Sequence, residues 1–207
     1  MPIGRKPLIA ILVAALLWFW MFSPWTTGLT NFWYTMTFSA VVLTSLALLD
    51  GGIRCQPSGR WWQQLLGGIV LAALLWGCFW VGDKVSSWLL PFARTQVDGV
   101  YAMKTGLAPW LIAVLLLTVI GPAEELFWRG YVQERLSRRL GTFTAFVVTT
   151  TVYTLIHIWS LNFMLIMAAL VAGVVWGFLY WLRPQWLPAL VISHALWDAL
   201  VFVILPI

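Results

Sequence analysis

The sequence predicts an all-α membrane protein, and its composition and its long apolar runs carry that prediction. Of the 207 residues, 62% are hydrophobic and only 9% are charged, whereas soluble proteins are about 25% charged. Several apolar runs reach the roughly 20 residues that an α-helix needs to cross a bilayer. Because no stretch between these runs is long and polar enough to fold separately, we expect a single membrane domain over residues 1–207.

The expected architecture is a polytopic bundle of about seven transmembrane helices. Arg5 and Lys6 precede the first apolar run, as in a signal peptide, but no clear small-x-small cleavage site follows, so we expect a retained first span. Segment 84–106 is expected to lie at the membrane interface or to form an eighth, short membrane element. The expected spans are 8–24, 32–49, 62–82, 107–135, 142–159, 162–182 and 186–206.

The distribution of basic residues predicts a cytoplasmic N-terminus. Under the positive-inside rule, short cytoplasmic loops carry the excess of Lys and Arg. With the N-terminus inside, the inner loops hold Arg5, Lys6, Arg54, Arg60, Arg135, Arg138, Arg139 and Arg183, and the outer loops hold Lys84, Arg94 and Lys104. The net charge of +5 therefore reports on topology. The basic residues lie in short loops and form no patch, so we expect no nucleic-acid partner.

Ionisable residues inside the apolar stretches mark the candidate site. The only two histidines, His157 and His194, lie in such stretches, as do Glu124, Glu125 and Asp198. An ionisable group at the centre of a span costs about 2.5–3.5 kcal/mol on insertion scales, so the default interpretation is a functional site. At about 1.5 Å per residue, these groups lie roughly 12–22 Å from the cytoplasmic ends of their helices. We therefore expect them to converge near mid-bilayer, slightly towards the cytoplasmic side.

The spacing of these residues suits acid–base chemistry. Glu125 and Arg129 are four residues apart on one helical face and can form an ion pair. Glu124 is rotated by about 100° from its neighbour, so it need not share the arginine and is a candidate general base. His194 and Asp198 also share a face. Together, a carboxylate and a histidine could activate water, and a second histidine could stabilise an oxyanion.

Three motifs resemble those of the CAAX protease and bacteriocin-processing family, also called the Abi family, of intramembrane glutamic endopeptidases. EExxxR stands at residues 124–129, FxxxH at residues 153–157 with Tyr153 in place of Phe, and HxxxN or HxxxD at residues 194–198. The resemblance covers about 107–200, the family-like catalytic core, whereas residues 1–106 carry no matching motif. It is specific because all three motifs occur in order on hydrophobic helices.

The resemblance implies an intramembrane protease in which Glu124 with His157 activates water. His194 with Asp198 would stabilise the tetrahedral intermediate, while Glu125 and Arg129 would support the geometry of the site. The aspartate departs from the HxxxN form: an asparagine can donate a hydrogen bond to an oxyanion, whereas an ionised aspartate cannot. We therefore expect Asp198 to orient His194, which alone would donate.

The resemblance further implies a membrane-anchored protein or peptide as substrate, cleaved near a CAAX-like or sorting-type C-terminus. We expect the chain to lie in the bilayer of a bacterial or archaeal cytoplasmic membrane and to need no cofactor. A zinc-dependent form of the same protease stays open, because two histidines and a carboxylate could supply three ligands. So does a non-catalytic scaffold or a proton-coupled transporter. In a scaffold the histidines would be helix-packing groups, whereas in a transporter they would belong to a proton relay. Tyr153 is expected to serve packing in any case.

Overall fold

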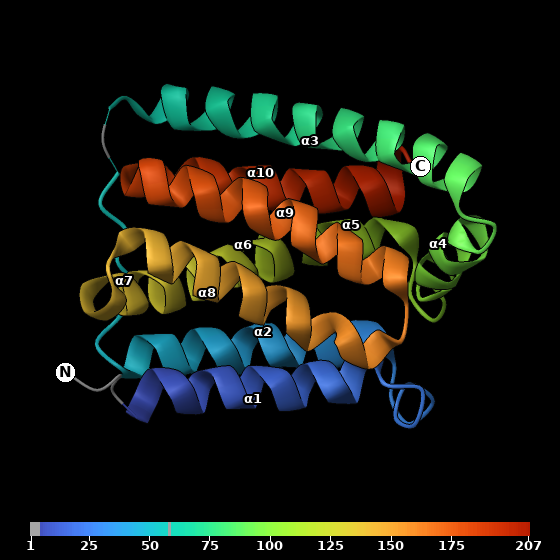
Figure 1. The fold of residues 1–207 in the computed structure, drawn as a ribbon, viewed down its shortest axis with the longest axis horizontal. Coiled ribbons are helices and arrows are strands. Elements are labelled where there is room, and N and C mark those ends of the chain that lie inside the picture. Colours follow the sequence, from blue (N-terminus) through green and yellow to red (C-terminus); the bar gives the residue numbers. More distant parts are fainter. Residues whose placement is uncertain (1–4, 58) are drawn as a thin grey trace.

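The computed structural model describes residues 5–57 and 59–207, apart from the side chain of Arg5, and every regular element in this part of the chain is a helix. The long helices run side by side along one axis (Figure 1). This confirms the predicted all-α bundle. The helices outside the central one are α1 (Arg5–Phe22), α2 (Phe32–Leu49), α3 (Trp61–Leu89), α4 (Ala93–Ala102), α8 (Thr142–Leu155), η3 (Ile156–Ser160), α9 (Phe163–Leu182), η4 (Pro184–Trp186), α10 (Leu187–Ala199) and η5 (Leu200–Ile204).

Six helices in the described residues are long and apolar enough to cross a membrane, so the chain is a multi-pass integral membrane protein. The first expected span corresponds to a shorter apolar helix, Lys6–Phe22. The third span is longer than the sequence predicts, because α3 continues through 83–89 before it ends at Leu89. Only α4, a ten-residue helix, follows from the segment expected at the interface. The six spans are Phe32–Leu49, Trp61–Leu89, Pro109–Leu140, Thr142–Ser160, Phe163–Leu182 and Pro184–Ile204.

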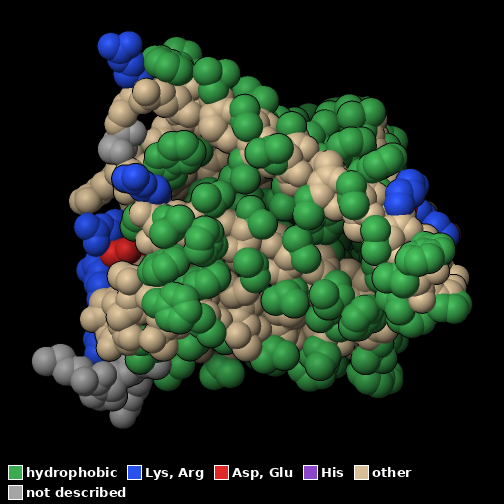
Figure 2. Space-filling model, turned by 45° about the horizontal axis from the view of Figure 1, so that its top comes forward, with side chains coloured by type: hydrophobic (Ala, Val, Ile, Leu, Met, Phe, Trp, Pro, Cys, Tyr) green, Lys and Arg blue, Asp and Glu red, His purple; other side chains and the backbone are tan. Residues whose placement is uncertain are grey.

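The charged side chains gather at the two ends of the bundle and leave an apolar belt between them (Figure 2). The helix directions place one set together at what we call the arginine-rich end: Lys6, Asp50, Arg54, Arg60, Glu134, Arg135, Arg138, Arg139 and Arg183. The opposite end carries Asp83, Lys84, Arg94, Asp98 and Lys104. This partition is the one that the loop charges predict.

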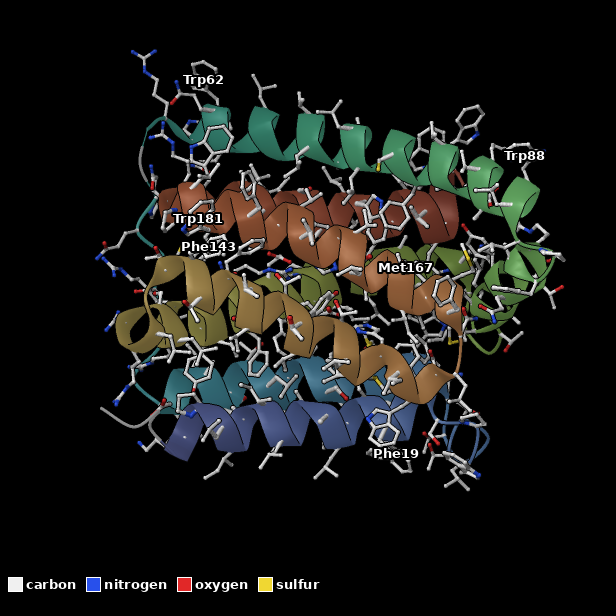
Figure 3. The ribbon with its side chains drawn as sticks, viewed as in Figure 1. Phe19, Trp62, Trp88, Phe143, Met167 and Trp181 are labelled. Atoms are coloured by element: carbon white, nitrogen blue, oxygen red, sulfur yellow. The ribbon has the colours of Figure 1, made fainter. Side chains whose placement is uncertain are left out.

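Exposed tryptophans flank the belt, as interfacial aromatic residues do. Trp62 and Trp88 lie at the two ends of α3 (Figure 3) and both are exposed. Trp33 also stands at a span end in the sequence, but its side chain is only 1% exposed. Its indole nitrogen donates to the carbonyl of Met103 at 3.0 Å, because the end of α4 folds over it.

The central helix of the bundle alternates between α-helical and wider π-helical turns. It consists of α5 (Pro109–Leu115), η1 (Leu116–Ile120), α6 (Gly121–Glu125), η2 (Leu126–Gln133) and α7 (Glu134–Leu140). Pro122 has no N–H and its ring crowds the preceding turn, which an ordinary α-helix accommodates poorly. The chain widens at this point: the N–H of Gly121 bonds to the carbonyl of Leu116, five residues back. Such π turns are frequent at functional sites.

Small residues let the helices around this central helix approach closely. A Cβ on Gly121 would lie 2.6 Å from the Cα of Ala195, so α6 and α10 are nearly in backbone contact. On α9, a Cβ on Gly173 would meet Tyr153 of α8 at 3.0 Å. These approaches bring the polar residues of α6, α8 and α10 within hydrogen-bonding reach of one another.

Candidate active site

One cavity inside the bundle brings the four predicted catalytic residues together. Its volume is about 100 Å³, and its wall includes Glu124, His157, His194 and Asp198, together with Tyr153. We call this cavity the chamber. Each of these residues is less than 9% exposed, and the rest of the lining is apolar or aromatic. The sequence-based expectation that these residues converge is thus met in space, across α6, α8, η3 and α10.

Glu124 offers a carboxylate oxygen to this chamber. Its Oε2 accepts a hydrogen bond from the hydroxyl of Tyr153 at 3.1 Å. Its Oε1 has no hydrogen-bond partner among the residues that the structure describes. A carboxylate held through one oxygen and open at the other is suited to hold and deprotonate a water molecule.

Glu125 does not offer a free oxygen in the same way, because it binds two neighbouring side chains. Its Oε1 accepts from Arg129 at 2.7 Å and from Nδ1 of His194 at 2.9 Å. The ion pair with Arg129, predicted from the four-residue spacing, is confirmed, and both side chains are almost completely buried. Arg129 also donates to the carbonyl of Gly173 at 3.2 Å, which fastens the central helix to α9.

His194 lies between two carboxylates. Its Nδ1 donates to Glu125, whereas its Nε2 lies 3.6 Å from Oδ2 of Asp198, longer than a hydrogen bond. Trp176 stacks on the imidazole with the ring centroids 3.9 Å apart and the planes 17° from parallel. Glu125 therefore makes the closer orienting contact that the sequence assigns to Asp198. No spacing rule could have found this contact, because the partners are 69 residues apart.

His157 has a partner on each ring nitrogen. Nδ1 lies 2.8 Å from the carbonyl oxygen of Tyr153, and a carbonyl only accepts, so Nδ1 carries the proton. Nε2 accepts from the indole nitrogen of Trp18 at 3.1 Å. The ring is thereby fixed as a neutral tautomer with its lone pair on Nε2. Trp18 belongs to α1, where the sequence shows no motif, so sequence reasoning gave no reason to include it.

Tyr153 does more than the packing that the sequence suggests. Its hydroxyl holds Glu124, its backbone carbonyl holds His157, and its ring lies against the guanidinium of Arg129 at 5.0 Å from the centroid. The four-residue spacing between Tyr153 and His157 was the available signal. It places the carbonyl of one residue beside the ring of the other.

The site does not show the geometry of a metal centre. Among the described residues, no group of three or more His, Cys, Asp or Glu side chains is arranged to hold a metal ion. Both nitrogens of His157 already have protein partners. Zinc ligation by this residue would require one of those bonds to be exchanged for a bond to the metal.

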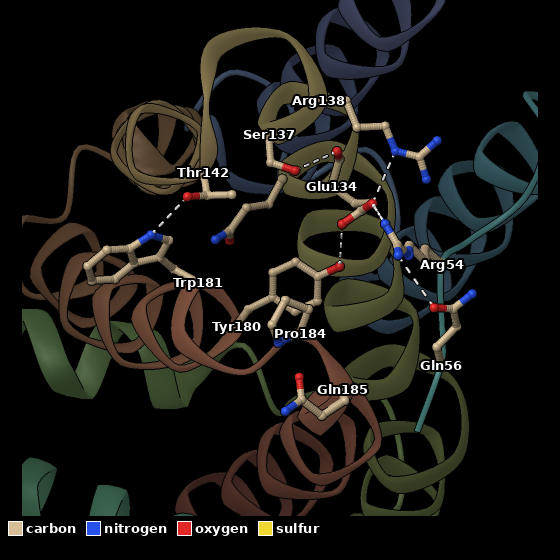
Figure 4. A pocket seen from close by; sticks show the side chains of 11 residues that line it. Arg54, Gln56, Glu134, Ser137, Arg138, Thr142, Tyr180, Trp181, Pro184 and Gln185 are labelled. Atoms are coloured by element: carbon tan, nitrogen blue, oxygen red, sulfur yellow. Dashed lines mark hydrogen bonds and ion pairs between the residues drawn. The ribbon is translucent and has the colours of Figure 1, made fainter. Parts of the chain in front are cut away.

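A second polar cavity lies at the arginine-rich end and is separate from the chamber (Figure 4). It has a volume of about 430 Å³ and shares no lining residue with the chamber. Glu134 organises it, accepting from Arg54 at 2.7 Å, Arg138 at 3.1 Å and Tyr180 at 3.1 Å. The bonds from Arg54 and Tyr180 join α7 to the α2–α3 connection and to α9, so we assign this network to packing of the bundle end.

Comparison with known proteins gave one match, to a family model, in the C-terminal half of the chain. Residues 105–200 match the Rce1-like family model, described as type II CAAX prenyl endopeptidase Rce1-like. The matched segment contains all three motifs and the five chamber residues named above, whereas Trp18, the hydrogen-bond partner of His157, lies outside it. Neither the curated proteins nor the solved structures gave a match.

Proposed function

Because residues 105–200 match the Rce1-like family model of CAAX prenyl endopeptidases, we propose that the chain hydrolyses a peptide bond near the C-terminus of a membrane-anchored substrate. The substrate would carry a CAAX-like or sorting-type C-terminal signal, and the membrane would be the cytoplasmic membrane of a bacterium or archaeon. One observation supports this most directly: within the membrane, Glu124 keeps an unbonded carboxylate oxygen on the wall of a cavity that also holds both histidines.

In the proposed reaction, Glu124 removes a proton from a water molecule while the oxygen of that water attacks the scissile carbonyl carbon. The C–N bond then breaks as the same carboxyl group returns the proton to the leaving amine. Tyr153 fixes the other oxygen of Glu124 throughout. No group is consumed in the cycle apart from the water added across the peptide bond.

His157 would hold the same water through its Nε2 lone pair. The bond from Nδ1 to the Tyr153 carbonyl keeps that lone pair on Nε2. In the resting structure the indole N–H of Trp18 occupies it. We propose that water replaces the indole when a substrate fills the chamber, which gives the water two acceptors, Glu124 and His157.

His194 would stabilise the negatively charged oxygen of the tetrahedral intermediate. Since its Nδ1 proton faces Glu125, Nε2 donates only when the ring carries a second proton. Glu125 and Asp198 supply the counter-charge for that form. Preorganised donors of this kind contribute about 2.7–4 kcal/mol to transition-state stabilisation in other acyl-transfer enzymes.

The deciding experiment compares purified wild type with Glu124→Gln on tail-anchored and CAAX-like substrates, with and without a chelator. Glu124→Gln keeps the shape of the side chain but removes the base, so we expect cleavage to fall at least about 100-fold, the lower range for general-base loss. Asp98→Asn, an exposed change at the opposite end, is the matched control. Loss of cleavage with chelator would favour the zinc alternative, and equal activity of wild type and Glu124→Gln would refute the assignment of the base.

A further inference from the structure

We infer that the polar cavity at the arginine-rich end binds the headgroup of an anionic phospholipid, a phosphodiester whose headgroup also carries a hydroxyl group. The inference is independent of the proposed protease reaction, because this cavity shares no lining residue with the chamber. It rests on the charge of the lining, on a buried oxygen atom without a hydrogen-bond partner, and on the aromatic surface beside the cavity.

The lining of the cavity carries one more positive charge than negative charges. Its charged residues are Arg54, Arg138 and Glu134. Both carboxylate oxygens of Glu134 are already engaged, because the two arginines donate to one and the hydroxyl of Tyr180 donates to the other. A further cation would therefore meet no free carboxylate oxygen. A group with a single negative charge would balance the lining, and a phosphodiester carries that charge at neutral pH.

The arginine side chains keep donors that Glu134 does not use. Within the described residues, Arg138 binds Glu134 through Nε alone, so its two terminal nitrogens remain available. Arg54 donates to Glu134 and, at 3.4 Å, to the side-chain oxygen of Gln56. The amide nitrogen of Gln56 thus keeps its two protons for another acceptor. Guanidinium groups bind phosphate oxygens particularly well, because their planar fork matches the geometry of the phosphate.

Further donors surround the same space. The hydroxyl oxygen of Thr142 accepts a hydrogen bond from the indole nitrogen of Trp181 at 3.2 Å, so its own proton remains for another acceptor. Thr142, Gln56 and Gln185 all line the cavity and frame it on three sides (Figure 4). Donors on several sides suit the two unbridged oxygens of a phosphodiester.

One buried oxygen on the wall of the cavity lacks a donor. Gln133 lines the cavity and is only 1% exposed, and its Nε2 donates to the carbonyl of Gly177 at 2.9 Å. Its Oε1 has no hydrogen-bond partner among the described residues. The amide cannot be turned round to remove this deficit, because a carbonyl only accepts. Since buried polar atoms are nearly always hydrogen-bonded, the oxygen indicates a ligand that brings a donor.

These requirements distinguish among the common phospholipid headgroups. Phosphatidylglycerol meets them, because its phosphodiester carries one negative charge and its terminal glycerol carries two hydroxyl groups. Phosphatidylethanolamine brings a donor, but its ammonium group cancels the charge of the phosphate. Phosphatidylcholine has neither a net charge nor a donor. The cavity should therefore prefer phosphatidylglycerol to both zwitterionic lipids.

The aromatic surface beside the cavity favours a lipid over a free phosphate ester. Trp181 lines the cavity and packs against Phe143 and Phe146, with ring centroids 5.4 and 6.2 Å apart. Phe143 is 57% exposed and lies beside Trp181 near the arginine-rich end (Figure 3). An acyl chain that leaves the cavity along α8 and α9 would cover these rings. Basic pockets between transmembrane helices bind anionic headgroups in this way.

Native mass spectrometry of the purified full-length protein measures lipid binding. Dioleoyl phosphatidylglycerol and dioleoyl phosphatidylcholine are titrated separately into the protein in detergent. We expect a saturable adduct with phosphatidylglycerol at concentrations at least about tenfold lower than those needed for phosphatidylcholine, as one charge-assisted hydrogen bond would give. Equal binding of the two lipids would overturn the inference.

Arg138→Gln tests the location of the site. The side chain of Arg138 is half-exposed and Glu134 keeps its bonds from Arg54 and Tyr180, so we expect the variant to fold. It should raise the half-saturating concentration of phosphatidylglycerol at least about tenfold. Arg183→Gln is the matched control, because it removes the same charge from an exposed residue at the same end that does not line the cavity. Equal effects of the two substitutions would assign the lipid to a diffuse basic surface and overturn the site.

The role of the headgroup hydroxyl is tested on the wild-type protein, so the folding of a variant does not enter. Dioleoyl phosphatidylethanol has the same phosphodiester charge as phosphatidylglycerol but no headgroup hydroxyl. We expect it to bind several-fold more weakly, because Oε1 of Gln133 would lose its donor. Equal binding would show that water satisfies this oxygen, and it would overturn the assignment of the headgroup.

Glycerophosphoglycerol, which is phosphatidylglycerol without its acyl chains, distinguishes a lipid from a soluble ester. We expect it to displace phosphatidylglycerol only at concentrations about 100-fold higher or more, since contact of a few methylene groups with the aromatic surface accounts for such a factor. Displacement at equal concentrations would assign the cavity to a soluble phosphodiester and overturn the lipid.

Discussion

Tyr153 connects the two residues that would activate water. Its hydroxyl reaches Glu124, and its carbonyl sets the tautomer of His157 from one helical turn away. The first contact requires a hydroxyl, whereas the second is made by the backbone and survives any substitution. The two roles of this tyrosine can therefore be separated by removing one oxygen atom.

Tyr153→Phe is expected to lower kcat by roughly 10- to 150-fold, since a hydrogen bond to a charged group contributes about 1.5–3 kcal/mol and 1.36 kcal/mol corresponds to tenfold in rate. KM should change little because the ring remains. Steady-state kinetics on the purified protein measures both values. Tyr131→Phe is the control: that hydroxyl bonds to Asp50 at the arginine-rich end, and its loss should leave kcat unchanged.

The buried ion pair between Glu125 and Arg129 is expected to matter more for stability than for chemistry. Arg129→Gln leaves a carboxylate without its counter-ion in the core, a change that costs about 3–5 kcal/mol elsewhere. Unfolding of the purified protein by denaturing detergent would measure the loss. The double variant Glu125→Gln/Arg129→Gln should recover part of it, and a double variant less stable than the single one would contradict this account.

At the scale of elements, the central helix owes its shape to two adjacent residues. Pro122 prevents a regular α-helix, and the π turns on both sides of α6 absorb the misfit. Gly121 then allows α10 to come close enough for His194 to reach Glu125. The π turns are invisible to hydrophobic periodicity, although a proline two residues before the first motif was a signal for irregular geometry.

Gly121→Ala is expected to lower both stability and activity. Its Cβ would meet the backbone of α10, which yields less readily than a side chain, and overpacking costs about 1–3 kcal/mol. The shift would also separate His194 from Glu125. Gly77→Ala on α3 has open space around it and should be neutral or slightly stabilising, since alanine favours helices by about 1 kcal/mol. Thermal unfolding and cleavage assays on both variants would measure the contrast.

Helix α4 illustrates how a short element can be fixed to the bundle by hydrogen bonds at both of its ends. Its residue Gln96 bonds to Asn162 and to the first turn of α9, at 2.8 and 3.0 Å. The hydroxyl of Tyr101 donates to the carbonyl of Val201 beyond α10 at 3.2 Å. These bonds hold α4 against the start of α9 and against η5, where the sequence predicts only an interfacial or short membrane segment.

At the scale of the whole molecule, Asp50 links three helices at the arginine-rich end: α1, α2 and the central helix. This carboxylate accepts from Tyr131 at 2.9 Å and pairs with Lys6 at 3.2 Å and Arg135 at 3.9 Å. Partial burial opposes ionisation, but the bonds from Tyr131 and Lys6 and the charge of Arg135 outweigh it and lower the pKa of Asp50.

This lowered pKa predicts a loss of stability in acid. The stabilisation is fully present above the ordinary carboxyl pKa of 3.8, and it is lost as the pH falls through the lower value of the folded protein. Asp50→Asn should be less stable than wild type at pH 7, and the difference should shrink below about pH 4. Thermal unfolding of both proteins across this range measures it. A difference that is constant with pH would contradict the assignment.

The sequence predicts the bundle, the spans and the partition of charge because each depends on hydrophobic run length or loop composition. It also predicts the Glu125–Arg129 pair, which one helical repeat defines. It does not reveal the contact between Glu125 and His194, nor the stacking of Trp176, because these depend on which helices are neighbours in space. A single chain contains no direct record of that adjacency.

The hydrogen bond from Trp18 to His157 means that the candidate site extends beyond the segment that matches the family model. Residues 105–200 carry the motifs, yet one ring nitrogen of a motif histidine is satisfied from α1. A polypeptide that began after α4 would present this imidazole unsupported and open to lipid. Co-expression of residues 1–104 as a separate chain should restore it, so the two halves would behave as fragments of one enzyme that complement each other in trans.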